Sequence, residues 1–437
     1  MLAAIAILCV FVLLAGLMYA GRLSALVALP VLAVATAAIG GLSWQQTAQT
    51  VVAEGAFRLH TAYVAAMVGS MLAQVVEKTG VAEAIVKNAA ELGGERPLPM
   101  ALLMAAVVAV LFITLGGLGA VIMVATIVFP ILLSVGVPPL AAACLFLLGM
   151  SVGGIFNLVN WQFYQQLLGL SQTTILRFAA PICGLLGVAT VIFAVVNARS
   201  PRRFWASEAA ERKRPPWYAL LTPLVPLVVV LPFSTKNWLL SLKGQPGGFE
   251  FPIVTALLVG VLWGVMSAKS GRGQLLTRCA IDGIAAVAPA VALMLGIGMV
   301  MNAFAGPAGT PPGEWKVAEQ IRPLLLKVVP SSPIGFVAVF GLLAPLALYR
   351  GPLNLWGMGS GLVAAIKATG YIQAEAVMAA FFSVGLIQGV CDPTNTHNVW
   401  IASHLDVDVQ RILKRTLPYV WAASVAGLVV GAIAFLR

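Results

Sequence analysis

Long apolar stretches recur along the whole chain, and they limit its architecture more than any other feature of the sequence. Each stretch is about 20 residues long, which is the helix length needed to cross roughly 30 Å of hydrocarbon. A backbone inside lipid must satisfy its own hydrogen bonds, so only helices or a closed barrel can span the bilayer. Barrel strands alternate apolar and polar residues, whereas these stretches are apolar on all sides. The sequence therefore predicts an all-α polytopic membrane protein.

The composition agrees with this prediction and excludes other classes. Of the 437 residues, 60% are hydrophobic and 9% are charged, against roughly 25% charged residues in a soluble domain. The net charge of +11 does not indicate a nucleic-acid partner, because the basic residues stand in short segments between apolar stretches, where they set topology. The five cysteines are scattered and form no CxxC pair, so we expect neither disulfides nor zinc. We expect a multi-pass protein of a bacterial inner membrane that needs no organic cofactor.

The apolar stretches fall into two sets of about five spanning helices. They lie near 1–19, 23–42, 57–77, 138–160 and 179–198, and near 216–233, 250–268, 280–303, 376–400 and 416–436. Two further apolar regions, 98–136 and 333–369, are too long for one span and carry glycine or proline near their middle. A hairpin that enters the membrane and returns to the same side explains both regions.

A basic stretch, 199–215, separates the two sets and is typical of a cytoplasmic linker. The halves on either side, 1–198 and 216–437, resemble each other near their ends. In 154–160 and in 389–395, a glycine is followed three and six residues later by a polar side chain. Because each half has an odd number of spans, homologous halves would insert with opposite orientations. We therefore expect two inverted repeats, each with a re-entrant hairpin and a discontinuous helix. The discontinuous helices are expected over 138–170 and 376–404. The alternative is that the glycines only let neighbouring helices pack closely.

The second discontinuous helix carries a dense polar cluster at membrane depth. Pro393 removes a backbone donor, so the helix must open near Asp392. Opened carbonyls and this carboxylate could ligate Na⁺, or the carboxylate could carry a proton. The alternative is that Asp392 only caps the next helix. We predict a coupling-ion or proton site at Asp392, Asn395 and Asn398, and substrate contacts from Thr394, Asn395, Thr396 and His397.

Arg350 is the basic residue deep inside the second expected hairpin. Its planar guanidinium matches a carboxylate, and a half-helix that begins after Pro352 would present free N–H groups and a positive dipole end. We therefore expect Arg350, with Asn354 beside it, to bind an anionic substrate. A structural ion pair with Asp392, or a side chain that reaches the interface, is the alternative.

Neutral groups complete the predicted site from the first half. Glycines break the first hairpin, and asparagines stand where the second half has its acidic cluster. Such discontinuities bind substrate in many transporters, although a buried polar cap would explain the asparagines equally well. The substrate-binding residues predicted in this half are Gly116, Gly117, Gly119, Asn157 and Asn160.

The order of these features resembles the ion transporter superfamily, near its gluconate–proton, citrate–metal and C4-dicarboxylate branches. The resemblance rests on 67–80 and the polar segment after it, on the hairpin breaks at 116–119 and 350–352, and on 391–398. The Ser-Asn-Thr pair of the divalent-anion branch is matched only in part, by Asn395 and Thr396. The resemblance implies a homodimer with a static scaffold and a mobile transport domain that moves like an elevator.

These features favour a secondary active transporter that carries a small organic anion, a carboxylate, across the bilayer with H⁺ or Na⁺. A cation–proton antiporter or inorganic-anion exporter of related fold is the alternative, with Asp392 as the ion site and Arg350 structural. An enzyme is not expected, because the sequence has no HExxH motif and no Ser/His pair at membrane depth. A carboxylate that raises the melting temperature would favour the first hypothesis.

Overall fold

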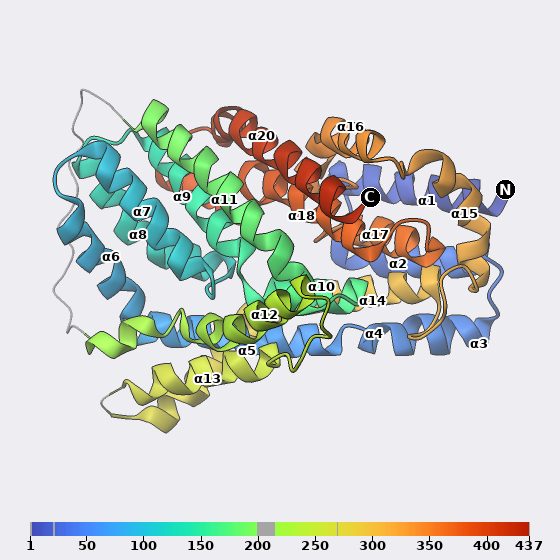
Figure 1. Cartoon of the computed structure of the whole chain (residues 1–437), viewed down its shortest axis with the longest axis horizontal. Helices are drawn as coiled ribbons and strands as arrows, with labels where there is room; N and C mark the ends of the chain where they lie inside the picture. Colours follow the sequence, from blue (N-terminus) through green and yellow to red (C-terminus); the bar gives the residue numbers. More distant parts are fainter. Residues whose placement is uncertain (1, 21, 199–214, 269, 437) are drawn as a thin grey trace.

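The structure, a computed structural model, describes residues 2–20, 22–198, 215–268 and 270–436, and this part of the chain is helical without strands (Figure 1). Within it, eight helices are long and apolar enough to cross a membrane, or nine if the bent pair Pro139–Ile155 and Leu158–Leu168 counts as one span. The prediction of an all-α polytopic membrane protein is confirmed. The expected basic linker, 199–215, lies outside the described residues except for its last position.

The first half begins with two apolar helices and a long third one. Its span from Trp44 to Lys78 is longer than the predicted 57–77, because a π-helical segment precedes the regular helix. A glycine-containing turn joins the two arms of the first hairpin, and α11 closes the half. The elements are α1 (Leu2–Tyr19), α2 (Ala25–Ile39), α3 (Trp44–Gln46), η1 (Thr47–Glu54), α4 (Gly55–Phe57), α5 (His60–Lys78), α6 (Val81–Gly93), α7 (Pro97–Phe112), α8 (Gly117–Ser134), α9 (Pro139–Ile155), α10 (Leu158–Leu168) and α11 (Gln172–Asn197).

The second half has a comparable order of elements. Its first long helix begins at Val225, not near residue 216 as the sequence suggested, because Pro223 and Pro226 suit the start of a helix and not its interior. The elements are η2 (Trp217–Leu221), α12 (Val225–Leu242), α13 (Ile253–Met266), α14 (Arg272–Ala305), α15 (Lys316–Val328), α16 (Pro333–Leu343), η3 (Ala344–Arg350), α17 (Gly359–Thr369), α18 (Ala374–Cys391), α19 (Thr396–His404) and α20 (Val409–Phe435).

Helices α5 and α14 form the centre of the packing and touch backbone to backbone. A Cβ added to Gly283 would lie 2.8 Å from the Met71 nitrogen in α5, and one added to Gly298 would lie 2.2 Å from the Gly55 carbonyl oxygen in the short helix α4 that precedes α5. Helix α2 packs on α14, and α13 packs on α5. The amphipathic helices α6 and α15 lie at opposite ends of the molecule (Figure 1).

The hairpins and broken helices pack around this centre. Helix α7 meets α9 closely, because Gly149 and Gly153 leave room for the Ala105 and Ala109 backbone. Helix α18 packs along α20 and also reaches α9. The two broken helices are therefore in contact with each other, and their discontinuities lie near one another in the interior.

A candidate substrate cavity between the two halves

A cavity of about 470 Å³ lies where the two halves meet. Both halves contribute the kinds of element that the sequence singled out, namely a hairpin and a broken helix, and α5 and α14 supply the remaining wall. Its lining includes Gly69 and Ser70 from α5; Thr114, Gly116 and Gly117 from the first hairpin; Ser151, Gly154, Asn157, Asn160, Phe163 and Tyr164 from α9 and α10; Ala290 and Met294 from α14; and Trp356, Phe381, Phe382, Gly385, Gln388 and His397 from the second half. A volume of this size suits a small organic molecule.

The first break is held by two asparagines. Helix α9 ends at Ile155, and α10 continues at an angle of 53° to it. The Asn157 side chain accepts from the Val159 N–H at 3.0 Å and donates to the Phe112 carbonyl at 3.4 Å. Asn160 donates to the Gly154 carbonyl at 3.3 Å. Both asparagines line the cavity, while their hydrogen bonds fix the angle of the break and attach it to the first hairpin.

The tip of the first hairpin presents the start of a helix to the cavity. Helix α8 begins at Gly117, and no side chain caps its first N–H groups. A Cβ added at Gly116, Gly117 or Gly119 would meet nothing within 4 Å. Gly116 and Gly117 line the cavity and Gly119 does not. Free N–H groups and the positive end of a helix dipole favour a negatively charged ligand.

Aromatic side chains form a large part of the wall and connect the two halves. Phe163 stacks on Trp356 with ring centroids 4.6 Å apart, and Tyr164 stacks on Phe382 at 5.3 Å. Sequence analysis missed these residues, because aromatic side chains in an apolar chain show no pattern that separates a cavity from a core. A weak signal exists in α18, where Phe381, Gly385 and Gly389 recur every four residues on one face.

The second break surrounds a buried carboxylate. Asp392 follows the end of α18 and is 0% exposed. Its Oδ1 accepts from the Thr394 N–H at 2.9 Å and hydroxyl at 2.7 Å, and its Oδ2 accepts from the Arg350 N–H at 3.3 Å. Asn398 donates to the Asp392 carbonyl at 3.0 Å, while its own buried Oδ1 has no hydrogen-bond partner. Asp392 thus makes the bonds of a cap, but it does so in a fully buried position.

Most of the predicted residues at this break stand behind the cavity wall. His397 lines the cavity, whereas Asp392, Thr394, Asn395, Thr396 and Asn398 do not. Asn395 reaches the lining indirectly, because it accepts from Gln388 at 3.1 Å and donates to the Gln388 carbonyl at 2.7 Å. Gln388 is a lining residue that the sequence analysis overlooked.

Arg350 does not lie where the sequence suggested. Its side chain is exposed, and the residue is not part of the cavity lining. The reason is local: Tyr349 and Arg350 both have left-handed backbone conformations, with φ of 55° and 57°, which turn the chain and present the Arg350 N–H to Asp392. Asn354 is buried and also off the lining, but its Oδ1 accepts from the Trp356 N–H at 2.9 Å and so positions a lining residue.

We therefore expect Arg350→Gly to leave ligand binding within about twofold of the wild type, because glycine keeps both the N–H group and the left-handed backbone. The measurement is an equilibrium titration of the purified variant with benzoate, a small planar member of the carboxylate class that the sequence predicts as substrate. Loss of binding would restore the guanidinium as the counter-charge that the sequence predicted.

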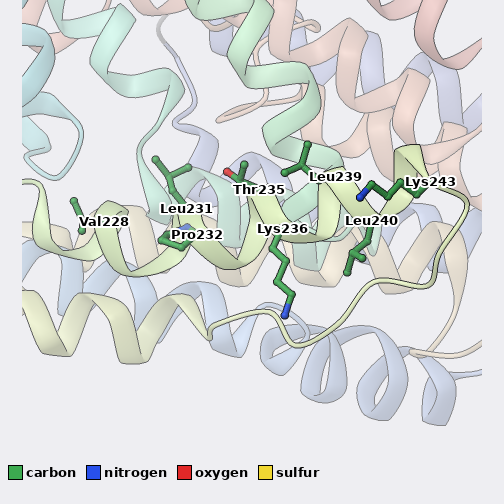
Figure 2. Close-up of a pocket in the computed structure, with 8 residues that line it drawn as sticks. All are labelled: Val228, Leu231, Pro232, Thr235, Lys236, Leu239, Leu240 and Lys243. Carbon is green, nitrogen blue, oxygen red and sulfur yellow. The ribbon is translucent and has the colours of Figure 1, made fainter.

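A second hollow, of about 660 Å³, runs along the outer face of α12. Seven of its eight lining residues belong to this one helix and the eighth, Lys243, directly follows it. The Lys236 side chain points away from Thr235 and Leu239 (Figure 2). A site built by one helix lacks the convergent polar groups of a binding pocket. The cavity between the halves is the stronger candidate.

Comparison with known proteins supports the fold. The chain matches no family model and no curated protein. Among solved structures, it is similar to the crystal structure of the YdaH transporter of Alcanivorax borkumensis, with a TM-score of 0.58, 17% sequence identity, and coverage of 86% of this chain and 85% of that one. At this identity the similarity shows a shared fold alone, and it does not single out the ion transporter superfamily.

Proposed function

We propose that the protein is a secondary active transporter of a small organic anion, a carboxylate, in a bacterial inner membrane. The observation that carries the proposal is the cavity between the halves, into which the uncapped start of α8 opens. Among the described residues, its lining holds no Asp, Glu, Lys or Arg. An anion would therefore be held by helix N–H groups and neutral side chains such as Ser151 and Asn160, and it would meet no repelling carboxylate.

The aromatic wall favours a ligand with an apolar body beside its charged group. Rings from both halves line one side, and stacking or edge-to-face contact with a ligand ring is favourable by about 0.5–1.5 kcal/mol beyond burial. A planar carboxylate such as benzoate combines these two requirements and is the probe we choose.

Asp392 and Asn398 are the proposed site of the coupling ion. The carboxylate has no direct ion pair among the residues that the structure describes, where the two side-chain pairs are Lys78–Asp282 and Glu83–Lys87. A buried carboxylate next to the unsatisfied Asn398 Oδ1 suits Na⁺, which prefers oxygen ligands, or a proton. The backbone contact between α5 and α14 favours these helices as a static scaffold of a homodimeric elevator, against which the hairpins would move.

Benzoate should raise the melting temperature of the purified protein, whereas benzyl alcohol, a neutral molecule of nearly the same shape, should not. A ligand at 100 times its Kd stabilises the folded state by about 2.7 kcal/mol. The screen is run with Na⁺ and with K⁺, together with succinate, citrate and gluconate. Stabilisation by Na⁺ alone, with no carboxylate effective, would favour the cation–proton antiporter, for which the unpaired Asp392 is the supporting observation.

A further inference from the structure

Two basic residues from different halves lie near the end of α10. Arg58 stands between α4 and α5, and Lys367 stands near the end of α17; both are half-buried. Arg58 Nη1 donates to the Gly306 carbonyl at 2.5 Å and to the Asn302 side chain. Lys367 Nζ donates to the Leu167 carbonyl at 2.9 Å. Both cations therefore bind the negative, carbonyl ends of helices, α14 and α10 respectively.

Neither cation has an acidic partner. The direct ion pairs within the described ranges involve other residues. Helices α14, α15 and α18 pack on α17. Their acidic residues, Asp282, Glu319 and Glu375, form no ion pair with Lys367. Their basic residues are Arg272, Arg278, Lys316, Arg322 and Lys327. Burial, and then the nearby Arg58 guanidinium, lower the pKa of the Lys367 ammonium to about 8. Two like charges that share a partly desolvated place without a counter-ion leave a positive field that an anion can use.

The contacts of the pair lie about one helical turn from residues that line the cavity. Leu167, which Lys367 contacts, is one helical turn beyond the lining residue Phe163. The start of α5 is tied to the same end of α10, since the Ala62 N–H donates to the Gln166 side chain at 3.0 Å. Ala66, one turn farther along α5, lines the cavity.

We propose that Arg58 and Lys367 form a cationic mouth, which attracts the anion at the α15 end of the molecule and delivers it to the cavity. The inference rests on the proposed function. Arg58 and Lys367 raise the local concentration of the substrate and do not bind it inside the cavity. Such a field raises the rate of anion arrival and leaves the turnover of a bound anion unchanged.

The local field can be measured without a substrate. A Cβ at position 169 lies 3.9 Å from Lys367 Nζ, so a Gly169→Cys thiol reports on this place. The probes are two methanethiosulfonates, one with an anionic sulfonate and one with a cationic trimethylammonium group. Both reagents react with the same thiol, so the ratio of their labelling rates does not depend on the intrinsic reactivity of that thiol. The background carries Cys9→Ser, because Cys9 is exposed, and labelling of that background alone is subtracted.

We expect the labelling rate of the anionic reagent, divided by that of the cationic reagent, to be about tenfold or more higher at this thiol than on a free thiol. Lys367→Gln, which can still donate to the Leu167 carbonyl, should lower this preference at least about threefold, and Lys367→Arg should preserve it. Between pH 7 and pH 9 the preference should fall in the lysine protein, as the ammonium loses its proton, and persist in the arginine variant. A ratio that Lys367→Gln leaves unchanged overturns the proposal.

Two further measurements complete the test. Because Gly169 has a φ of +76°, the labelling is repeated on a Ser171→Cys chain, which keeps the glycine. Benzoate uptake by proteoliposomes should show a KM raised about threefold or more by Lys367→Gln with an unchanged maximal rate. Lys243→Gln, at the exposed residue that follows α12, should change neither. Absence of benzoate uptake in the wild type would count against the proposed function, while the labelling ratio would still decide whether the mouth is cationic.

Discussion

Gly154→Leu should abolish benzoate uptake and leave the protein folded. A Cβ added to Gly154 meets nothing within 4 Å, because it points into the cavity. A leucine side chain would therefore occupy space that the substrate needs, without displacing a neighbour. The carbonyl that accepts from Asn160 is part of the backbone and is kept. We expect uptake by proteoliposomes to fall at least about a hundredfold, with an unchanged elution profile and melting temperature.

The preceding residue supplies the matched control. A Cβ on Gly153 would lie 2.1 Å from the Ala109 carbonyl oxygen and 3.0 Å from its Cα, so α7 and α9 would have to separate. Overpacking of this kind costs about 1–3 kcal/mol, and Gly153→Ala should lower the melting temperature. Gly153→Ala therefore tests helix packing, whereas Gly154→Leu tests whether the substrate occupies the cavity. Wild-type uptake by Gly154→Leu would mean that the substrate does not use the cavity.

Asp392→Asn should remove the dependence of uptake on the coupling ion. An asparagine can still accept from Thr394, but its amide nitrogen cannot accept from the Arg350 N–H as Oδ2 does. It also removes the negative charge that a Na⁺ ion or a proton requires. A loss of about 1.4 kcal/mol or more in the binding free energy of the coupling ion lowers its affinity at least about tenfold, so uptake driven by a Na⁺ or pH gradient should fall by about tenfold or more.

Asp408→Asn is the control that separates ion binding from helix capping. Asp408 caps α20 and accepts from the Gln410 N–H at 2.9 Å, but its side chain is exposed. Asparagine caps helices about as well as aspartate, so this variant should behave like the wild type. If Asp392→Asn is equally mild, with gradient dependence intact, then Asp392 serves only as a cap.

The parts of the fold that follow from chain-wide physics could be predicted from sequence. Apolar length predicts helices in lipid, and proline or paired glycines predict where a helix cannot continue. The structure ends helices at Ile155 and Cys391 and turns the first hairpin before Gly117. Gly116, Gly117, Asn157, Asn160 and His397, which were chosen for these reasons, line the cavity.

The errors arise where a local backbone conformation decides the outcome. The sequence of Tyr349 and Arg350 does not indicate two consecutive left-handed residues, which only glycine and asparagine adopt readily. Arg350 was therefore expected inside the cavity although its side chain lies outside. The aromatic stacks were missed for another reason: Phe163 and Trp356 are far apart in sequence, and only tertiary packing brings them together.

The close crossing of α5 and α14 determines which parts of the protein can rearrange. Gly283 and Gly298 are separated by about 22 Å along α14. Gly283 meets the main chain of α5 at Met71, Gly298 meets that of α4 at Gly55, and neither contact leaves space for a methyl group. If α14 pivoted or slid against the α4–α5 segment, the backbones would have to separate at one of these two contacts. In the proposed transport cycle, access to the cavity would therefore change by displacement of the hairpins and the broken helices, with α14 and the α4–α5 segment as the static part.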